Sequence, residues 1–255
     1  ATTGSLVVTL EALKEMHLTP EDIQLIQNDT KTCPDTGMAG ASRSLYMDGN
    51  ATIIAANKLL AAMRKEDGTL RTYDEMKAEG IETKYLGRYE TNTTPGLCRL
   101  DPNTGIGDPT PAFTYCLNLA EVEVDTKTGK TTVLKFTCVD FVGRIGNIDA
   151  VNGQAYSGIM HGIGFALKED YADVKKHANM FGAGTSYIKD VPDDINLIHI
   201  DGAISDGPFG SSGASEAFQA SGHCAVLNGI YNACGGVRSE IVALRNSMHP
   251  KIRSS

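Results

Sequence analysis

The chain has 255 residues, of which 41% are hydrophobic and 21% charged. This is enough for one large globular domain or two modest ones. The net charge is −8 at pH 7. Because no basic stripe could neutralise phosphates, we expect no nucleic-acid partner. The apolar runs are short and interrupted, so we also expect no transmembrane helix and no membrane partner.

The chain starts at Ala1 rather than at a methionine and shows no signal peptide. We therefore expect a piece of a longer protein or one subunit of a divided one, in the cytoplasm. None of the six cysteines forms a CxxC pair, which argues against a structural zinc or iron–sulfur site within this chain. At this length and cysteine fraction, buried free thiols are expected rather than a disulfide framework.

Apolar spacing predicts the elements of the first half. A helix is expected over residues 4–17, and the alternating run 23–27 allows a short strand. Residues 28–44 form a loop rich in Thr, Gly, Ala and Ser, which leads into a clear helix over about 45–64. A shorter helix is expected over 72–80, with Thr72 as its cap.

Residues 91–112 are rich in proline and glycine and have no periodicity, which is typical of a linker. They divide the chain into a first α/β subdomain, 1–90, and a second, 113–255. In the second, alternation predicts two strands joined by a hairpin turn, followed by helical and strand patterns. The expected elements are strands at 112–125, 131–142 and 195–200, helices at 146–167 and 218–234, and a last segment at 237–244. The fold class is α+β, that is, mixed α/β.

A glycine-rich stretch from Gly207 leads to Glu216, the only ionisable side chain between Asp206 and His223. A carboxylate among small and apolar residues loses hydration, so its pKa should rise toward the range of a general base. The alternative is a surface turn followed by a helix, with Glu216 in the first turn, where the helix dipole favours a negative charge. On this stretch alone the alternative is favoured.

Ser42, Arg43 and Ser44 lie where a loop enters a helix. Hydroxyls, exposed amides and a guanidinium together favour a phosphate or pyrophosphate. A serine N-cap beside an incidental arginine is an equally good interpretation.

Four residues of the predicted helix 146–167 stand out. Gly158 and Gly162 are four apart, which would let another backbone pack closely. Gln154 is either fixed by neighbouring groups or directed at a ligand, and without further context packing is favoured. His161 is expected to be a core residue.

Four segments occur in a distinctive order: GMAGASRS, LAEVEVDTKTGKTTV, NGQAYSGIMHGIGFALKED and DGPFGSSGASEA. Together they resemble the C-terminal half of the molybdenum-binding region in the xanthine oxidase family. The likeness covers nearly the entire chain. It is strongest to bacterial aldehyde oxidoreductases that carry molybdopterin cytosine dinucleotide.

The resemblance implies a molybdenum hydroxylase that oxidises a small aldehyde to a carboxylic acid, with water as the oxygen source. Glu216 matches the family's catalytic glutamate beside the molybdenum, and Gln154 matches a glutamine that contacts the cofactor. Ser42, Arg43 and Ser44 match a loop that holds the pterin dinucleotide, and no protein side chain is expected to bind the metal. The [2Fe–2S] clusters and the rest of the molybdenum site would lie upstream or in a partner subunit, and the full enzyme would be a homodimer. The chain alone is expected to be inactive.

The sequence departs from the family around the glutamate. The family commonly has a glycine before it and an apolar residue plus proline after it, whereas Ser215 and Ala217-Phe218 stand here. These departures and the missing upstream domains leave an alternative, a cofactor-less interaction or assembly subunit on the same scaffold. The choice between an aldehyde and an N-heterocycle as substrate also stays open.

Overall fold

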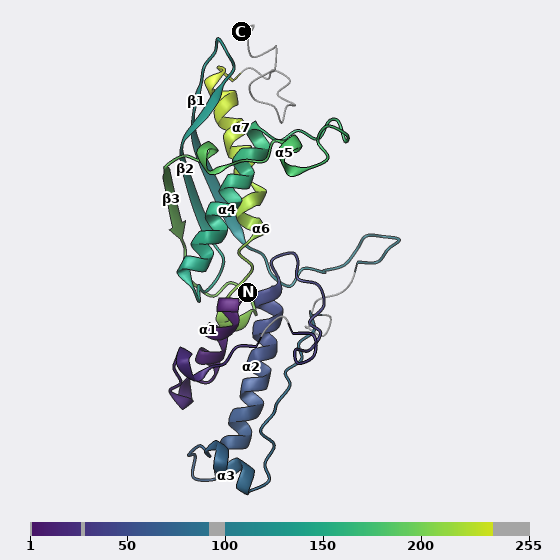
Figure 1. Ribbon diagram of the computed structural model, residues 1–255, viewed down its shortest axis with the longest axis vertical. Coiled ribbons are helices and arrows are strands. Elements are labelled where there is room, and N and C mark those ends of the chain that lie inside the picture. Colours follow the sequence, from purple (N-terminus) through teal and green to yellow (C-terminus); the bar gives the residue numbers. More distant parts are fainter. Residues whose placement is uncertain (1, 27–28, 92–99, 237–255) are drawn as a thin grey trace. The chain divides into compact units, whose positions relative to one another are not determined.

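The structure is a computed structural model that describes residues 2–26, 29–91 and 100–236 (Figure 1). Contacts group the chain into two compact units that alternate along the sequence. Unit 1 comprises Ala1–Phe113, Gly143–Ile148 and Gly202–Gly213, and unit 2 comprises Thr114–Val142, Asp149–Asp201 and Ala214–Ser255. The division into 1–90, 91–112 and 113–255 stays a prediction. The predicted segment 237–244 lies outside the described residues.

Unit 1 is built on two helices, α1 (Thr2–Ala12) and α2 (Ser44–Met63). Their shared core contains Leu13, Ala56 and Leu60, flanked by partly buried leucines and methionine. A Cβ on Gly4 would lie 2.8 Å from Leu45 Cδ1, so this glycine permits the close approach of α1 to α2. The two helices predicted from apolar spacing are therefore confirmed.

The third helix of unit 1, α3 (Tyr73–Ala78), begins at the predicted cap, Thr72, which forms a capping box with Glu75. Thr72 Oγ1 accepts from the Glu75 amide, and the Glu75 carboxylate accepts from the Thr72 amide at 2.7 Å. The possible strand at 23–27 is wrong for its described part, since residues 23–26 pair with no strand there. An extended run without a partner cannot form a ladder.

Unit 2 contains a three-stranded sheet in the order β1–β2–β3. Strands β1 (Tyr115–Val124) and β2 (Thr131–Phe141) are antiparallel, and the predicted turn joins them, with the Asp125 amide donating to Lys130 O at 2.9 Å. Strand β3 (Asp194–His199) runs parallel to β2. The three predicted strands are thus confirmed.

Helices α4 (Ile148–Leu167), α6 (Glu216–Ala220) and α7 (Gly222–Ala233) lie on one side of this sheet (Figure 1). The helix predicted over 218–234 is two helices, because the chain breaks at Ser221 (φ −116°). A short helix, α5 (Met180–Ala183), lies in the segment between α4 and β3. The unit is a mixture of helix and sheet, as the predicted fold class requires.

Side-chain alternation places the core of unit 2 between β2 and the helices. Fully buried residues from both layers meet there: Phe136, Cys138, Ile159, Ile163, Phe218, Val226 and Ile230. Asn118 donates to Ser221 Oγ at 2.8 Å, so the even-numbered residues of β1 face the helices. The opposite face of β1 exposes Tyr115, Leu117 and Leu119, which are 62%, 63% and 57% exposed.

Two glycines let α4 pack directly against the backbone of α6 and α7. A Cβ on Gly158 would lie 2.5 Å from Phe218 Cβ, and one on Gly162 would lie 2.9 Å from Gly222 Cα. The close packing predicted from their spacing is confirmed. It fixes the helix that carries Gln154 against the helix that carries Glu216.

The five described cysteines are free, as expected, but only Cys138 is fully buried. The other described cysteines are half-buried or exposed, so the expectation of buried thiols holds for Cys138 alone among the described cysteines. Cys98 lies outside the described residues.

Candidate cofactor site

Glu216 is the first residue of α6, in unit 2, and its side chain is exposed. The loss of hydration expected from its small neighbours is therefore wrong for the described residues, which do not cover the carboxylate. In this respect the structure agrees with the alternative, a turn followed by a helix with the acid in its first turn.

Gln154 is joined to the residue before the glutamate. It is exposed on α4, and its Oε1 accepts a hydrogen bond from Ser215 Oγ at 2.7 Å. Gln154 is therefore exposed rather than buried, but a neighbouring group fixes its side chain, as the favoured interpretation held. The structure thus brings two of the predicted site residues, Gln154 and Glu216, into one local arrangement within unit 2. His161, also expected in the core, is exposed.

Ser42, Arg43 and Ser44 lie in unit 1, at the start of α2. The helix begins at Ser44, and its N-cap is Arg43, whose side chain makes no capping hydrogen bond. The serine N-cap interpretation is therefore wrong. The Arg43 guanidinium instead donates to Met38 O at 2.9 Å, across the loop.

The backbone of this loop adopts an unusual conformation for its residue types. Ala41 and Ser42 have φ values of 54° and 52°, in the left-handed region that residues other than glycine rarely occupy. Such conformations cost about 1–3 kcal/mol each and gather at ligand-binding sites. The loop therefore keeps a shape that its own sequence does not favour.

The glycine-rich stretch, far along the chain, packs against the same loop. A Cβ on Gly213 would lie 2.7 Å from both Ser42 Cβ and Ser42 O, so only glycine fits against Ser42. The stretch also pairs with Gly143, whose φ is 81° and whose added Cβ would lie 2.4 Å from Gly210 O. Gly207–Gly213 thus supports the Ser42 loop in unit 1, whereas Ser215 and Glu216 belong to unit 2.

Each unit offers polar groups that could contact an anionic cofactor. The first-turn amides of α2 and the hydroxyls of Ser42 and Ser44 are donors suited to a phosphate. Gln154 offers an amide and Glu216 a carboxylate. Across the described residues, no group of three or more His, Cys, Asp or Glu side chains could hold a metal ion.

A cluster that was not predicted reaches α4 at Asn152, two residues before Gln154. His199 Nδ1 is 2.6 Å from Asp140 Oδ2, and His199 Nε2 is 2.7 Å from Asn152 Oδ1. Asp140 is only 1% exposed, and this burial raises the pKa of its carboxyl, against the opposing effect of His199. The one sequence signal was the alternation of β2, which places Asp140 on the same face as Phe136 and Cys138.

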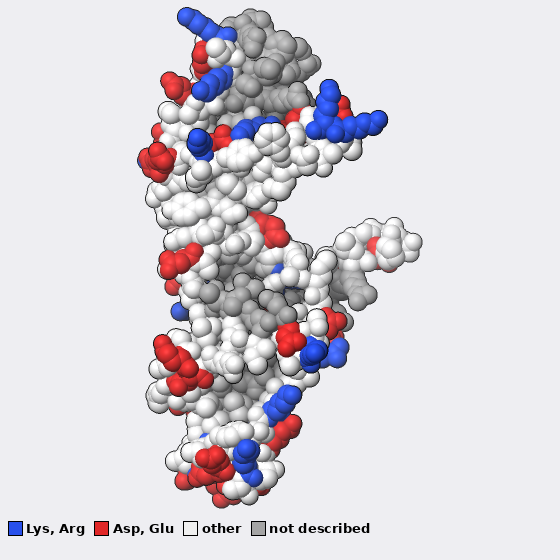
Figure 2. Space-filling view, in the orientation of Figure 1, with Lys and Arg blue, Asp and Glu red and all other residues white. Residues whose placement is uncertain are grey.

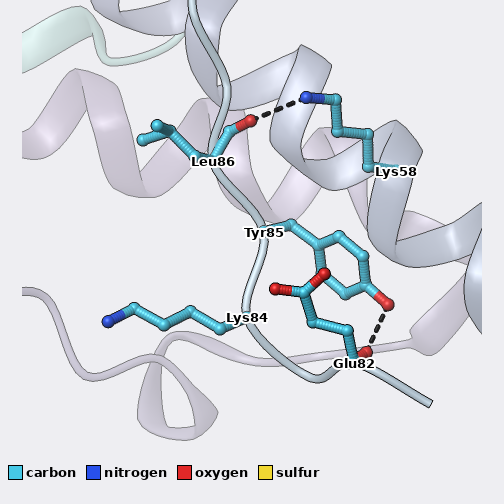
Figure 3. Close-up of a pocket in the computed structure, with 5 residues that line it drawn as sticks. All are labelled: Lys58, Glu82, Lys84, Tyr85 and Leu86. Carbon is cyan, nitrogen blue, oxygen red and sulfur yellow. Dashed lines mark hydrogen bonds between the residues drawn. The ribbon is translucent and has the colours of Figure 1, made fainter.

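A surface pocket of about 390 Å³ in unit 1 is lined by Lys58, Glu82, Lys84, Tyr85 and Leu86 (Figure 3). Lys58 Nζ donates to Leu86 O at 2.9 Å, and the Tyr85 hydroxyl donates to Glu82 O. The lysine is thus engaged with the backbone that forms the pocket wall. None of the predicted site residues lines this pocket.

On the face drawn in Figure 2, basic side chains stand singly or in small groups with acidic ones nearby. No helix within the described part of the chain has the length and apolar character needed to cross a membrane.

Comparison with known proteins identifies the family. Residues 3–192 match the family described as Molybdopterin cofactor-binding domain. Aldehyde oxidoreductase of Megalodesulfovibrio gigas is 41% identical over 225 residues, which cover 88% of this chain and 24% of that protein. Probable hypoxanthine oxidase XdhD of Escherichia coli K12 is 28% identical, over 90% of this chain and 26% of that protein.

The crystal structure of aldehyde oxidoreductase from Desulfovibrio desulfuricans superposes with a TM-score of 0.89 at 43% identity. The superposition covers 98% of this chain and 27% of that one. The chain therefore spans about a quarter of the length of the relatives it matches. It belongs to the family of molybdopterin cofactor-binding domains, in agreement with its resemblance to the molybdenum-binding region of the xanthine oxidase family.

Proposed function

We propose that this chain is the C-terminal cofactor-binding part of a molybdenum hydroxylase that oxidises aldehydes to carboxylic acids with water. The similarity at about 40% identity to two aldehyde oxidoreductases supports the reaction class. The observation that carries the site is the 2.7 Å hydrogen bond between Ser215 and Gln154. It joins the segment of Glu216 to a glutamine 61 residues away, the two positions that the family resemblance selects.

The cofactor of the proposal is molybdopterin cytosine dinucleotide, which supplies the two-electron redox chemistry when bound. Ser42 and Ser44, with the first amides of α2, would hold its phosphates. Arg43 keeps the loop in shape through Met38 O. Because Gly213 lies so close to Ser42, a residue larger than glycine does not fit at position 213. The [2Fe–2S] clusters that receive the electrons lie in the rest of the enzyme.

In the reaction, Glu216 removes a proton from the water that becomes the new oxygen of the acid. A positioned base of this kind contributes about 10²–10⁴ in rate. Ser215, which departs from the family's glycine, has φ −85° and ψ −69°, an ordinary helical conformation that requires no glycine. Its hydroxyl instead anchors the segment to Gln154.

The partner of the chain is the upstream part of the same enzyme or a partner subunit that carries it, in a homodimer of the whole. The exposed Tyr115, Leu117 and Leu119 on the helix-free face of the sheet support this, because contiguous apolar patches mark interaction sites. Further along β1 the same face of the strand is polar, because Glu121 and Glu123 are exposed there.

The test is Glu216→Gln in the complete enzyme, with Glu21→Gln, also exposed, as the control. We expect Glu216→Gln to retain molybdenum and cytosine nucleotide while its turnover falls by about 10²–10⁴-fold. The control should behave as the wild type. Near-normal turnover of Glu216→Gln contradicts the assignment, and a wild-type enzyme without molybdenum or nucleotide supports the cofactor-less assembly subunit.

A further inference from the structure

We infer that Asp140, His199 and Asn152 form a positioning group that fixes the first turns of α4 and thereby the place of Gln154 and Glu216. We call these three residues the His199 clamp. Its consequence for catalysis rests on the function proposed above. Its structural part stands independently of that function.

The clamp ties together three elements of unit 2. Asp140 lies near the end of β2 and His199 at the end of β3, and the parallel register pairs these two residues directly. Asn152 comes from the second turn of α4. Since each imidazole nitrogen reaches a different element at 2.6–2.7 Å, the ring fixes the distance between the sheet and the helix.

The hydrogen-bonding partners determine where the protons lie. Asn152 Oδ1 only accepts, so His199 Nε2 carries a proton and donates it. Its other nitrogen, Nδ1, lies 2.6 Å from Asp140 Oδ2. This suits a carboxylate whose other oxygen, Oδ1, is buried without a hydrogen-bond partner. The imidazole is therefore the group that compensates the burial of Asp140.

The polar contacts in the first turns of α4 lie on either side of a residue that adds no packing of its own. Gly153 stands between Asn152 and Gln154, and a Cβ built on it would meet no atom within 4 Å. Residues two apart on a helix point about 200° apart. Asn152 thus holds the helix from the sheet side, while Gln154 receives Ser215 on another side. The clamp and the Gln154–Ser215 bond fix the same stretch of backbone from two directions.

The experiment compares His199→Phe, which removes both hydrogen bonds, with Asn152→Leu and Asn152→Asp in the complete enzyme. Asn152→Leu keeps the His199–Asp140 contact, so it tests the link to α4 even where His199→Phe does not fold. Asn152→Asp keeps an acceptor for Nε2 and should rescue. The matched control is His177→Phe, since His177 also faces an aspartate, Asp170, at 3.5 Å within unit 2.

Hydrogen exchange gives the readout that does not require activity. We expect His199→Phe and Asn152→Leu to speed amide exchange both in 149–156 and in 214–218. Asn152→Asp and His177→Phe should leave both segments unchanged. Faster exchange in 149–156 alone would overturn the link to Glu216, and unchanged exchange in both would overturn the clamp itself.

Kinetics gives the catalytic readout. His199→Phe should lower kcat about tenfold or more, because small displacements of a catalytic group are costly, while KM stays within about twofold. In a Gln154→Ala background the same substitution should cause no further loss. Full additivity of the two losses would refute the route through Gln154. If Glu216→Gln proved active, the proposed reaction would fail, yet the exchange result would still decide on the clamp.

Discussion

Ser215 Oγ donates to Gln154 Oε1 across 2.7 Å, linking the residue before Glu216 to the exposed side of α4. A single neutral hydrogen bond of this kind is worth about 0.5–1.5 kcal/mol. We expect Ser215→Ala and Gln154→Ala each to lower the free energy of unfolding by an amount near the lower end of this range, because both residues are exposed. The loss in the double variant should be smaller than the sum of the two single losses. A double-mutant cycle by urea unfolding measures this coupling. Ser157→Ala, on an exposed position of α4, is the control, and strict additivity would show that the bond does not persist in solution.

Two glycines of α4 should respond oppositely to the same substitution. Gly158→Ala would place a Cβ 2.5 Å from Phe218 Cβ and should destabilise by about 1–3 kcal/mol. Gly153→Ala meets open space in a helix and should stabilise by about 0.5–1 kcal/mol. Thermal unfolding of the two variants side by side measures the difference. Equal effects would contradict the packing of α4 on α6.

The Ser42 loop offers a similar pair for cofactor retention. Gly213→Ala forces its methyl group to within 2.7 Å of Ser42, so the loop must shift. Gly40→Ala lies in the same loop but would meet only Met38 Cε at 3.9 Å, an ordinary contact. We expect the purified Gly213→Ala enzyme to lose a large part of its cytosine nucleotide and molybdenum, and the Gly40→Ala enzyme to keep them. Full retention in Gly213→Ala would remove the loop from the cofactor site.

Local patterns predicted the elements that they determine. The period of α2 and α4, the alternation of β1 and β2, and the cap at Thr72 depend on residues a few positions apart, and each was found. The run at 23–26 had the alternation of a strand but no partner to pair with in the structure. Periodicity alone also could not place the break at Ser221.

The site was predicted only in part because its geometry depends on distant residues. The family resemblance selected Gln154 and Glu216, and the structure joins their segments through Ser215, which stood out only as a departure from the family's glycine. Their exposure was missed, since the identity of flanking residues does not fix which face of a helix is covered. The His199 clamp links residues 47 and 59 positions apart, through a parallel register that no local pattern encodes.

The capping box of α3 predicts a pH dependence. The Lys65 ammonium, which donates to Glu75 at 2.8 Å, and the Thr72 amide lower the pKa of Glu75 from 4.5 to about 2. A carboxyl with a lowered pKa stabilises the folded state above its ordinary pKa, and this stabilisation is lost as pH falls through the folded value. The contribution should therefore disappear between about pH 4.5 and pH 2.

Carboxyl-carbon NMR titration of Glu75 measures that pKa directly. Unfolding curves of Glu75→Gln should show a weaker pH dependence in the same window than those of the wild type. Glu66→Gln, on the neighbouring turn, is the control and should follow the wild type. A Glu75 midpoint near 4.5 would show that the capping box does not form.

The chain passes between its two units five times, at 113–114, 142–143, 148–149, 201–202 and 213–214. Neither unit can therefore be excised as one continuous piece of gene. Recombination between related enzymes that keeps both units intact must exchange the two units together. The Ser42 loop and the residues around Glu216 are then inherited together.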